Sequence, residues 1–248
     1  MYKRQPLRWA HLVIEHKSFD EKAMFWKRTK GNPELDFEPG EKYSYSNLSY
    51  AMLGQIIEKV SSKSLEEVFQ AEINSPLGID TKDLGFDFVQ DREYATGYLK
   101  RWSMINFVKY LIVDKKLYDE YEDGWLKFNR HLVDYKAMGG LIGNAKNVSV
   151  FLQDLLRDES KLLNKESKAL LFQTAKNNRG EDVKMTLGWH IGKLDGKMFY
   201  YKEGGGAGYH CEMRMYPSLD LATVVMTNST TFDVKDFLNK SDFTVRTK

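Results

Sequence analysis

A tyrosine and an asparagine stand two residues apart at positions 45 and 47, in the stretch Tyr45-Ser46-Asn47. A loop-to-helix junction is predicted here, and from it both side chains can point into one cleft. The phenol of Tyr45 can exchange a proton if a nearby cation lowers its pKa. The amide of Asn47 can hold a substrate carbonyl. A packed tyrosine followed by a helix cap fits the same pattern, so both interpretations stay open at this point.

A second candidate site is a lysine followed by a glycine run, Lys202-Glu203-Gly204-Gly205-Gly206. The pattern predicts a strand that ends at Lys202 and a glycine-rich turn over 204–206 that opens the next strand. Glycines let a ligand lie against the strand, where backbone N–H groups can bind an oxyanion and the lysine can hold a carboxylate. An ordinary hairpin with a solvated lysine fits the same residues.

Several predicted helices must position the first site. Apolar residues recur at helical spacing over 47–60, with Ser46 or Asn47 as the cap. Ser64-Leu65-Glu66-Glu67 resembles a capping box and predicts a second helix that runs into the Pro-Leu-Gly of 76–78. Further helices are predicted over 148–156 and 167–175, and the glycine pair 139–140 is predicted to enter a helix.

The second site belongs to a predicted run of antiparallel strands over 186–191, 197–202, 209–216 and 222–227. Turns are predicted at 195–196, where Asp-Gly is a strong hairpin signal, at 204–206 and at 217–220. Helices followed by an antiparallel meander predict an α+β fold. We expect a single domain over 1–248, mainly helical over 1–184 and made of antiparallel strands over 185–230.

Composition excludes several classes of partner. The 248 residues include 37 basic and 35 acidic side chains, a net charge of +2, so no nucleic acid or anionic membrane is expected as a partner. The most apolar run, 102–113, is short and interrupted by Lys109, which predicts a buried or amphipathic helix and no membrane span. The N-terminal stretch shows no apolar core of a secretory signal.

No metal or cofactor motif is found in the sequence. The single cysteine, Cys211, excludes an intrachain disulfide. The five histidines show no ligand spacing typical of zinc. No cofactor is expected, and a small-molecule substrate is expected only from the family resemblance of the motifs described below.

The order of the motifs resembles the penicillin-recognising serine hydrolases, the group of class C β-lactamases, D,D-peptidases and esterases. Each motif is short, but the ordered set covers nearly the whole chain. It consists of Pro39-Gly40, Tyr45-Ser46-Asn47, Pro76-Leu77-Gly78, Gly139-Gly140-Leu141, Leu187-Gly188-Trp189, Lys202-Glu203-Gly204 and Met226-Thr227-Asn228.

The resemblance implies a β-lactamase-like fold and a role for each site residue. Tyr45 would be the general acid and base, and Asn47 would contact the substrate amide. Lys202 would be the cation of the Lys-Thr-Gly-type motif. The backbone N–H of Gly205 would form one half of the oxyanion hole.

Glu203 and Gly204 complete that motif among the expected substrate-binding residues, but Glu203 stands where the family usually has threonine. A carboxylate there would repel substrates whose own carboxylate binds at the same place. This departure favours an ester or a peptide-like amide over a penicillin as the substrate.

The nucleophile that the resemblance implies is missing from this sequence. The family uses a serine and a lysine one helical turn apart, and no serine here has a lysine three residues later. Only 44 residues precede Tyr45, so we expect that the upstream segment with the nucleophile is absent. Three alternatives follow: a hydrolase whose nucleophile is missing from this chain, an inactive binding protein on the same scaffold, or an inert fragment that does not fold stably alone and can self-associate.

Overall fold

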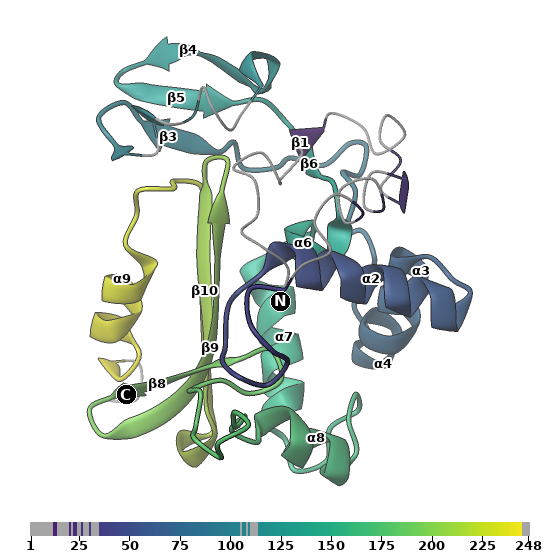
Figure 1. Cartoon of the computed structure of the whole chain (residues 1–248). Coiled ribbons are helices and arrows are strands. Elements are labelled where there is room, and N and C mark those ends of the chain that lie inside the picture. The colour runs from purple at the N-terminus through teal and green to yellow at the C-terminus, as the bar shows by residue number, and fades with distance from the viewer. Residues whose placement is uncertain are drawn as a thin grey trace.

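A four-stranded antiparallel sheet organises the C-terminal half of the fold (Figure 1). The structure is a computed structural model, which describes residues 12–13, 20, 22–23, 26, 30, 35–104, 106–107, 109 and 114–244. In the sheet order β11-β10-β9-β8, the strands are β8 (His190–Leu194), β9 (Lys197–Gly206), β10 (Tyr209–Tyr216) and β11 (Leu221–Thr227).

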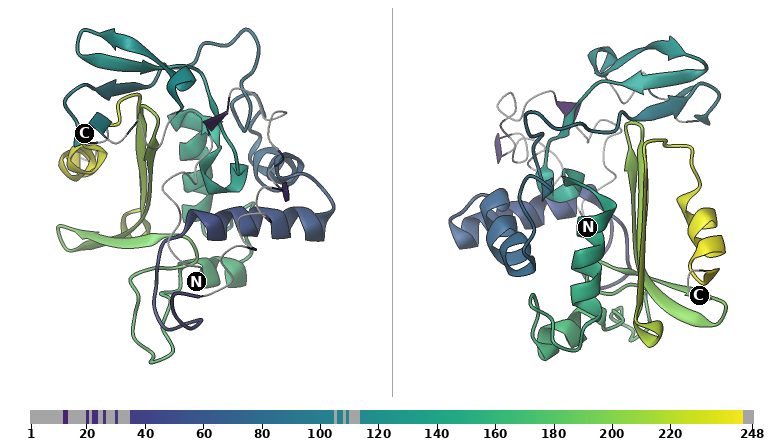
Figure 2. Two further views of the ribbon diagram at one scale, coloured as in Figure 1. Left: turned by 45° about the horizontal axis from the view of Figure 1, so that its top comes forward. Right: turned by 180° about the vertical axis from the view of Figure 1, so that it is seen from behind.

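Helices cover both faces of this sheet (Figure 2). Helix α7 (Ala145–Leu156) packs Leu152 and Leu155 against Met215 of β10, and these residues belong to one buried apolar cluster. Helix α8 (Lys165–Phe172) follows, with the ring of Phe172 4.7 Å from that of Tyr200 on β9. Helix α9 (Val234–Ser241) covers the opposite face and buries Val234 and Leu238.

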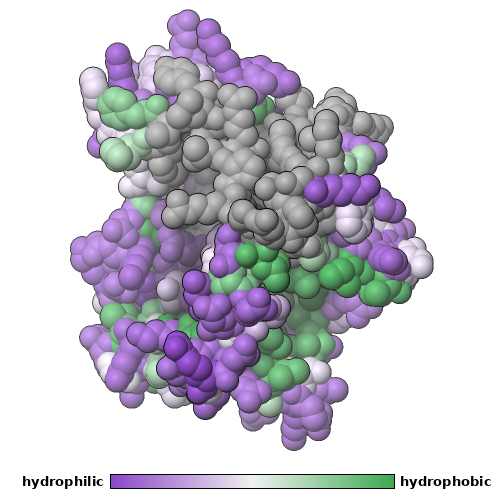
Figure 3. Space-filling model, in the orientation of Figure 1, coloured by the Kyte–Doolittle hydropathy of each residue, from purple (hydrophilic) through white to green (hydrophobic). Residues whose placement is uncertain are grey.

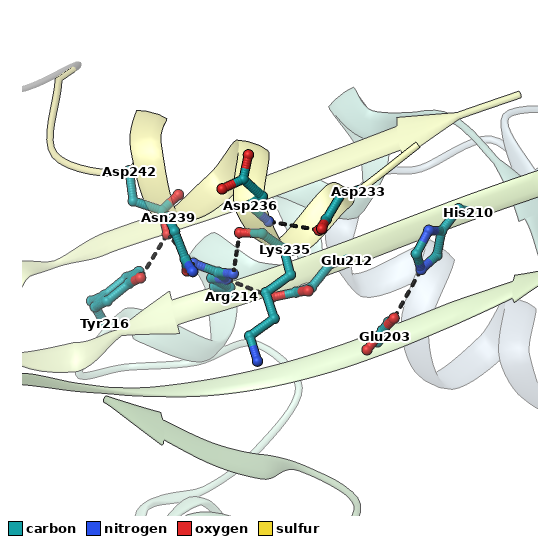
Figure 4. Close-up of polar contacts among 10 residues, drawn as sticks. All are labelled: Glu203, His210, Glu212, Arg214, Tyr216, Asp233, Lys235, Asp236, Asn239 and Asp242. Atoms are coloured by element: carbon teal, nitrogen blue, oxygen red, sulfur yellow. Dashed lines mark hydrogen bonds and ion pairs between the residues drawn. The ribbon is translucent and has the colours of Figure 1, made fainter. Parts of the chain in front are cut away.

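A buried polar network attaches α9 to the sheet (Figure 4). Arg214 of β10 is fully buried, and its guanidinium donates to Glu212 at 2.5 Å and to Asn239 and Asp242 at 2.9 Å each. The hydroxyl of Tyr216 donates to Asp242 at 2.6 Å. These bonds satisfy charges that would otherwise be costly to bury.

The first candidate site begins helix α2 (Asn47–Ser61). Ser46 is its N-cap and accepts a hydrogen bond from the Ser49 amide at 3.3 Å. Leu48 and Ala51 of this helix pack on the buried ring of Tyr135, next to α6 (Lys136–Gly139). The start of α2 is therefore fixed by its cap and by the apolar residues of its first turns.

The predicted second helix is a sequence of three short helical segments. Ser64 caps α3 (Leu65–Phe69) in a complete capping box with Glu67. A π-helical turn (Gln70–Asn74) and α4 (Ser75–Leu77) follow, and Gly78 ends the run in the left-handed region with φ +69°.

Small antiparallel sheets accompany the main sheet, and the one made of β3, β4 and β5 lies above it in Figure 1. One has the strand order β3-β5-β4, and two pairs join β1 with β6 and β2 with β7. Their bounds are β1 (Leu12–Val13), β2 (Leu84–Gly85), β3 (Tyr98–Lys100), β4 (Tyr118–Glu122), β5 (Trp125–Phe128), β6 (Leu132–Val133) and β7 (Ile142–Gly143). Single 3-10 turns occupy Lys115–Leu117 and Pro217–Leu219.

The structure confirms the α+β class and most predicted elements, and it corrects three of them. The strand predicted over 186–191 begins only at His190, because the Thr186 amide donates to the Trp189 carbonyl and Gly188 has φ +92°. The glycines 204–206 lie inside β9, and the turn is Ala207-Gly208 instead.

The glycine pair at 139–140 ends helix α6, with Gly140 as its C-cap, whereas α7 starts five residues later behind the cap Asn144. Helix α9 had no counterpart among the predicted elements. The helix predicted over 102–113 falls partly outside the described residues. Among the residues that are described, none of the helices has the length and apolar character needed to cross a bilayer.

Candidate functional site

Lys202 and Tyr50 form the centre of the candidate site. The ammonium of Lys202, on β9, donates a hydrogen bond to the Tyr50 hydroxyl at 3.2 Å. The same ammonium lies 5.0 Å from the centroid of the Tyr50 ring, a geometry in which the ring face attracts the cation. Tyr50 belongs to the first turns of α2, so this contact joins the helix to the sheet.

Tyr45 and Asn47 lie at the same end of α2. The ring of Tyr45 is 6.2 Å from that of Tyr50, and 55% of Tyr45 is exposed. Asn47 is the first residue of the helix and is half-buried. The structure therefore groups Tyr45 and Lys202 around one residue, Tyr50.

The glycine run contributes a free strand edge beside Lys202. Strand β8 pairs with β9 only as far as Tyr201, opposite His190, whereas β10 pairs with β9 through Gly206. Within the described residues, the part of β9 from 202 to 206 therefore has a neighbouring strand on one side only. Alternate N–H groups on this edge point away from β10, where they can meet a substrate oxygen.

Neighbouring side chains of β10 leave little room for a Cβ atom at Gly204 and Gly205. A Cβ atom at Gly204 would lie 3.3 Å from the sulfur of Cys211, and one at Gly205 would lie 3.1 Å from the His210 ring. Both approaches are close, so a side chain at either place would displace its partner on β10.

Glu203 lies on the other face of the sheet from Lys202, because successive side chains of a strand alternate between its faces. Its carboxylate is 2.8 Å from Nε2 of His210 (Figure 4). In the strand register Glu203 is opposite Glu212, whose side chain bonds Arg214 on the α9 side of the sheet. The sequence-based argument that Glu203 repels anionic substrates needs its carboxylate in the Lys202 cleft, and this position does not support that argument.

Burial and neighbouring charges shift the pKa of several groups around Lys202. Burial raises the pKa of Tyr45, and the adjacent Tyr50 adds to the shift. Burial lowers the pKa of His190, and the Lys202 ammonium lowers it further. His190 stacks on Tyr201 at 5.0 Å and meets the edge of Tyr43 at 6.3 Å. Since His190 pairs with Tyr201, strand alternation places both side chains on the face of the sheet that carries Glu203, and not on the face of Lys202.

No group of three or more histidine, cysteine, aspartate or glutamate side chains in the described part of the chain could hold a metal ion.

Tyr50 is a residue of this site that the sequence analysis did not single out. Tyr50 follows Asn47 by three residues, so helical spacing places both on one face of α2. This spacing is the signal that could have identified Tyr50.

Comparison with known proteins gives one family and several distant relatives. The model of the family described as Beta-lactamase matches residues 20–241. An unguisins hydrolase of Aspergillus campestris is 24% identical over 199 residues, which are 77% of this chain and 34% of that protein. Penicillin-binding protein 4* of Bacillus subtilis is 27% identical over 184 residues, 73% of this chain and 38% of that protein.

Solved structures share the fold. A D-stereospecific amidohydrolase from Streptomyces has a TM-score of 0.63 at 18% identity, over 85% of this chain and 57% of the other. The chain spans about a third of the length of the two curated relatives. Since the family model covers most of the chain, the protein belongs to the beta-lactamase family, within the superfamily of penicillin-recognising serine hydrolases.

Proposed function

We propose that this chain carries the carbonyl-binding and proton-transfer part of an acyl-serine hydrolase site that acts on esters or peptide-like amides. The main support for the proposal is the position of the Lys202 ammonium. It donates to Tyr50 at 3.2 Å and lies beside the free edge of β9. A fixed cation and strand N–H groups next to one another stabilise the negative charge that develops on an attacked carbonyl oxygen.

Each site residue has a distinct task in this proposal. Lys202 orients the substrate and stabilises negative charge, and the Gly205 N–H binds the carbonyl oxygen. Tyr45 transfers a proton between the nucleophile and the leaving group, and Asn47 holds the substrate amide. Gly204 keeps the strand open to the substrate. Glu203 is left out of the substrate contacts because its side chain bonds His210 on the other face.

The nucleophile of the family's reaction is a serine that forms an acyl intermediate, which water then hydrolyses. Since no Ser-x-x-Lys occurs in this sequence, the chain as printed is expected to bind its ligand without turning it over. A binding protein on the same scaffold is the second candidate. The hydrogen bond of the Lys202 ammonium to Tyr50 favours it, because that contact does not activate Tyr45 as a base, and burial raises the pKa of Tyr45.

Ligand binding and covalent labelling together test the proposal. N-acetyl-phenylalaninamide, a neutral peptide-like amide, should bind reversibly to the full chain in an NMR titration. Lys202→Met and Tyr45→Phe should each weaken that binding. Equal affinity in the wild type and in Lys202→Met would contradict the site assignment.

A fluorophosphonate or a labelled penicillin should leave the chain unmodified in mass spectrometry, because no serine has the activating lysine. Stoichiometric labelling of one serine would show that the chain holds a rearranged nucleophile, and it would decide for the enzyme over the binding protein.

A further inference from the structure

A cavity of about 250 Å³ opens beside Tyr50. Tyr43, Tyr50 and Met185 are among its lining residues, so part of its wall is apolar. Pockets for drug-sized ligands measure roughly 300–1,000 Å³. The cavity is therefore of the right size for one side-chain-sized group of a larger ligand.

The walls of the cavity are tied to one another by backbone hydrogen bonds. The Ala175 amide donates to the Met185 carbonyl at 2.7 Å, and the Val183 amide donates to the Ala175 carbonyl at 3.1 Å. The Asn178 amide donates to the Gly40 carbonyl at 2.8 Å. The first two bonds hold residues 175–185 together, and the third joins this segment to the loop before α2, so the cavity has a defined shape before any ligand binds.

Thr186 is an unsatisfied polar group in the cavity wall. It is only 6% exposed, and its hydroxyl makes no hydrogen bond within the part of the chain that the structure describes. A buried hydroxyl without a partner costs free energy. A polar ligand atom at this wall would supply the missing partner.

The charges that line the cavity are positive. Lys42 and Lys176 are both among its lining residues. The Lys176 ammonium is 3.9 Å from the Asp182 carboxylate, but both side chains are more than 60% exposed, so this pair is weak. Lys202 adds a third ammonium at the shared Tyr50 wall.

We propose that this cavity is a subsite for an anionic group on an apolar or aromatic body, adjoining the Lys202 site. The body would pack on Tyr43, Tyr50 and Met185, and the anion would face Lys42 and Lys176. The inference rests on the proposed function where it concerns the substrate, since it implies that one arm of the ester or amide carries a negative charge. The binding of an anion in the cavity is testable separately.

Two small probes of equal shape test the subsite, phenylacetate and its neutral isostere phenylacetamide. In NMR titrations of the full isotope-labelled chain, phenylacetate should shift the amide signals of Ala175, Thr186 and Gly188. It should bind ~5-fold more tightly than phenylacetamide, as expected for two weak, partly exposed ion pairs. The Thr186→Val variant should bind both probes more weakly.

Charge-matched variants give the control. Lys42→Gln combined with Lys176→Gln should reduce the preference for phenylacetate to about one, in line with the loss of both ion pairs. Lys193→Gln combined with Lys197→Gln removes the same charge from the β8–β9 hairpin, outside the cavity, and should keep the preference.

Three results would overturn the subsite: absence of shifts at residues 183–188, equal binding of both probes by the wild type, or an unchanged preference in the Lys42 and Lys176 variant. Failure of the proposed function looks different, because there N-acetyl-phenylalaninamide binds independently of Lys202 and Tyr45. Each of the two proposals can therefore fail while the other holds.

Discussion

At the scale of single residues, Tyr50 is the group that links the two candidate motifs. It contacts Lys202 through its hydroxyl and its ring face, and it lies beside Tyr45. A tyrosine that only packed in the core would make no such pair of contacts with an ammonium. We therefore expect a measurable coupling free energy between Tyr50 and Lys202.

A double-mutant cycle measures that energy. Tyr50→Phe removes the hydrogen bond and keeps the ring, and Lys202→Met removes the cation. The coupling free energy from denaturant unfolding of the two single variants and the double variant should be about 0.5–1.5 kcal/mol. A coupling close to zero would show that the contact contributes nothing in solution.

The phenol of Tyr45 should titrate above its usual value near 10.0, because burial raises its pKa. Unfolding lowers the pKa back toward that value, so from about pH 10 upward the unfolded chain loses this proton first and stability falls. The difference in alkaline absorbance titrations between the wild type and Tyr45→Phe isolates this group. A midpoint below 10 would instead indicate a phenol activated by a cation.

At the scale of elements, helix α9 depends on the buried Arg214. Replacing Arg214 with leucine leaves Glu212 and Asp242 buried without their cation, which should cost about 3–5 kcal/mol. Hydrogen exchange should then be fastest in α9 and slower in α7. Lys240→Gln breaks the exposed Lys240–Asp236 pair on the same helix and should change stability by less than about 1 kcal/mol.

Two hairpin turns of the sheet provide a second comparison. Gly196 and Gly208 both have positive φ, at +78° and +91°. A Cβ atom at Gly196 would meet nothing within 4 Å, whereas one at Gly208 would lie 2.4 Å from the backbone of Gly97. Gly196→Ala should cost about 1–2 kcal/mol from backbone strain alone.

Gly208→Ala should cost more than Gly196→Ala, since it also forces the β9–β10 hairpin away from β3. Tyr98 at the start of β3 donates its amide to the Gly208 carbonyl at 3.1 Å, and that bond should be lost. Thermal unfolding of both variants gives the comparison, and equal melting temperatures would contradict the close packing.

The elements that sequence predicted well are those whose signals are local. The Ser46 cap of α2, the capping box at Ser64 and the Asp195-Gly196 turn each depend on a few neighbouring residues, and all three are found. The glycines of 204–206 were placed in a turn because glycine disfavours strands. Pairing with β10 over these residues overrides that preference.

The site was predictable only in part for the same reason. The family resemblance led us to expect Tyr45 and Lys202 near each other. The contact of Tyr50 with Lys202 depends on how α2 packs against β9, which the sequence does not show. The direction of Glu203 depends on the strand continuing past Lys202. With a turn predicted at 204, nothing in the sequence placed that carboxylate on the α9 face, beside His210.

At the scale of the whole molecule, two surfaces are open to association. The outer edge of β11 pairs with no other strand among the described residues. Helix α2 exposes Leu53, Ile56 and Val60 at 51%, 49% and 77%, and Figure 3 shows apolar surface over this helix. Free strand edges and apolar patches both favour contacts between copies.

We therefore predict that the isolated chain self-associates as its concentration rises, with a marginal and poorly cooperative thermal transition. Sedimentation or size-exclusion chromatography over a concentration series measures this. Met226→Lys places a charge on the exposed part of β11, where charged side chains oppose edge pairing, and Val60→Lys does the same for the apolar face of α2. Loss of association in only one of these variants identifies the surface involved.

A compact monomer at all concentrations, with a sharp transition well above about 60 °C, the upper range for mesophilic domains, would contradict the prediction. It would also favour the binding protein, since a stable monomer needs no further segment to hold the Lys202 site in place.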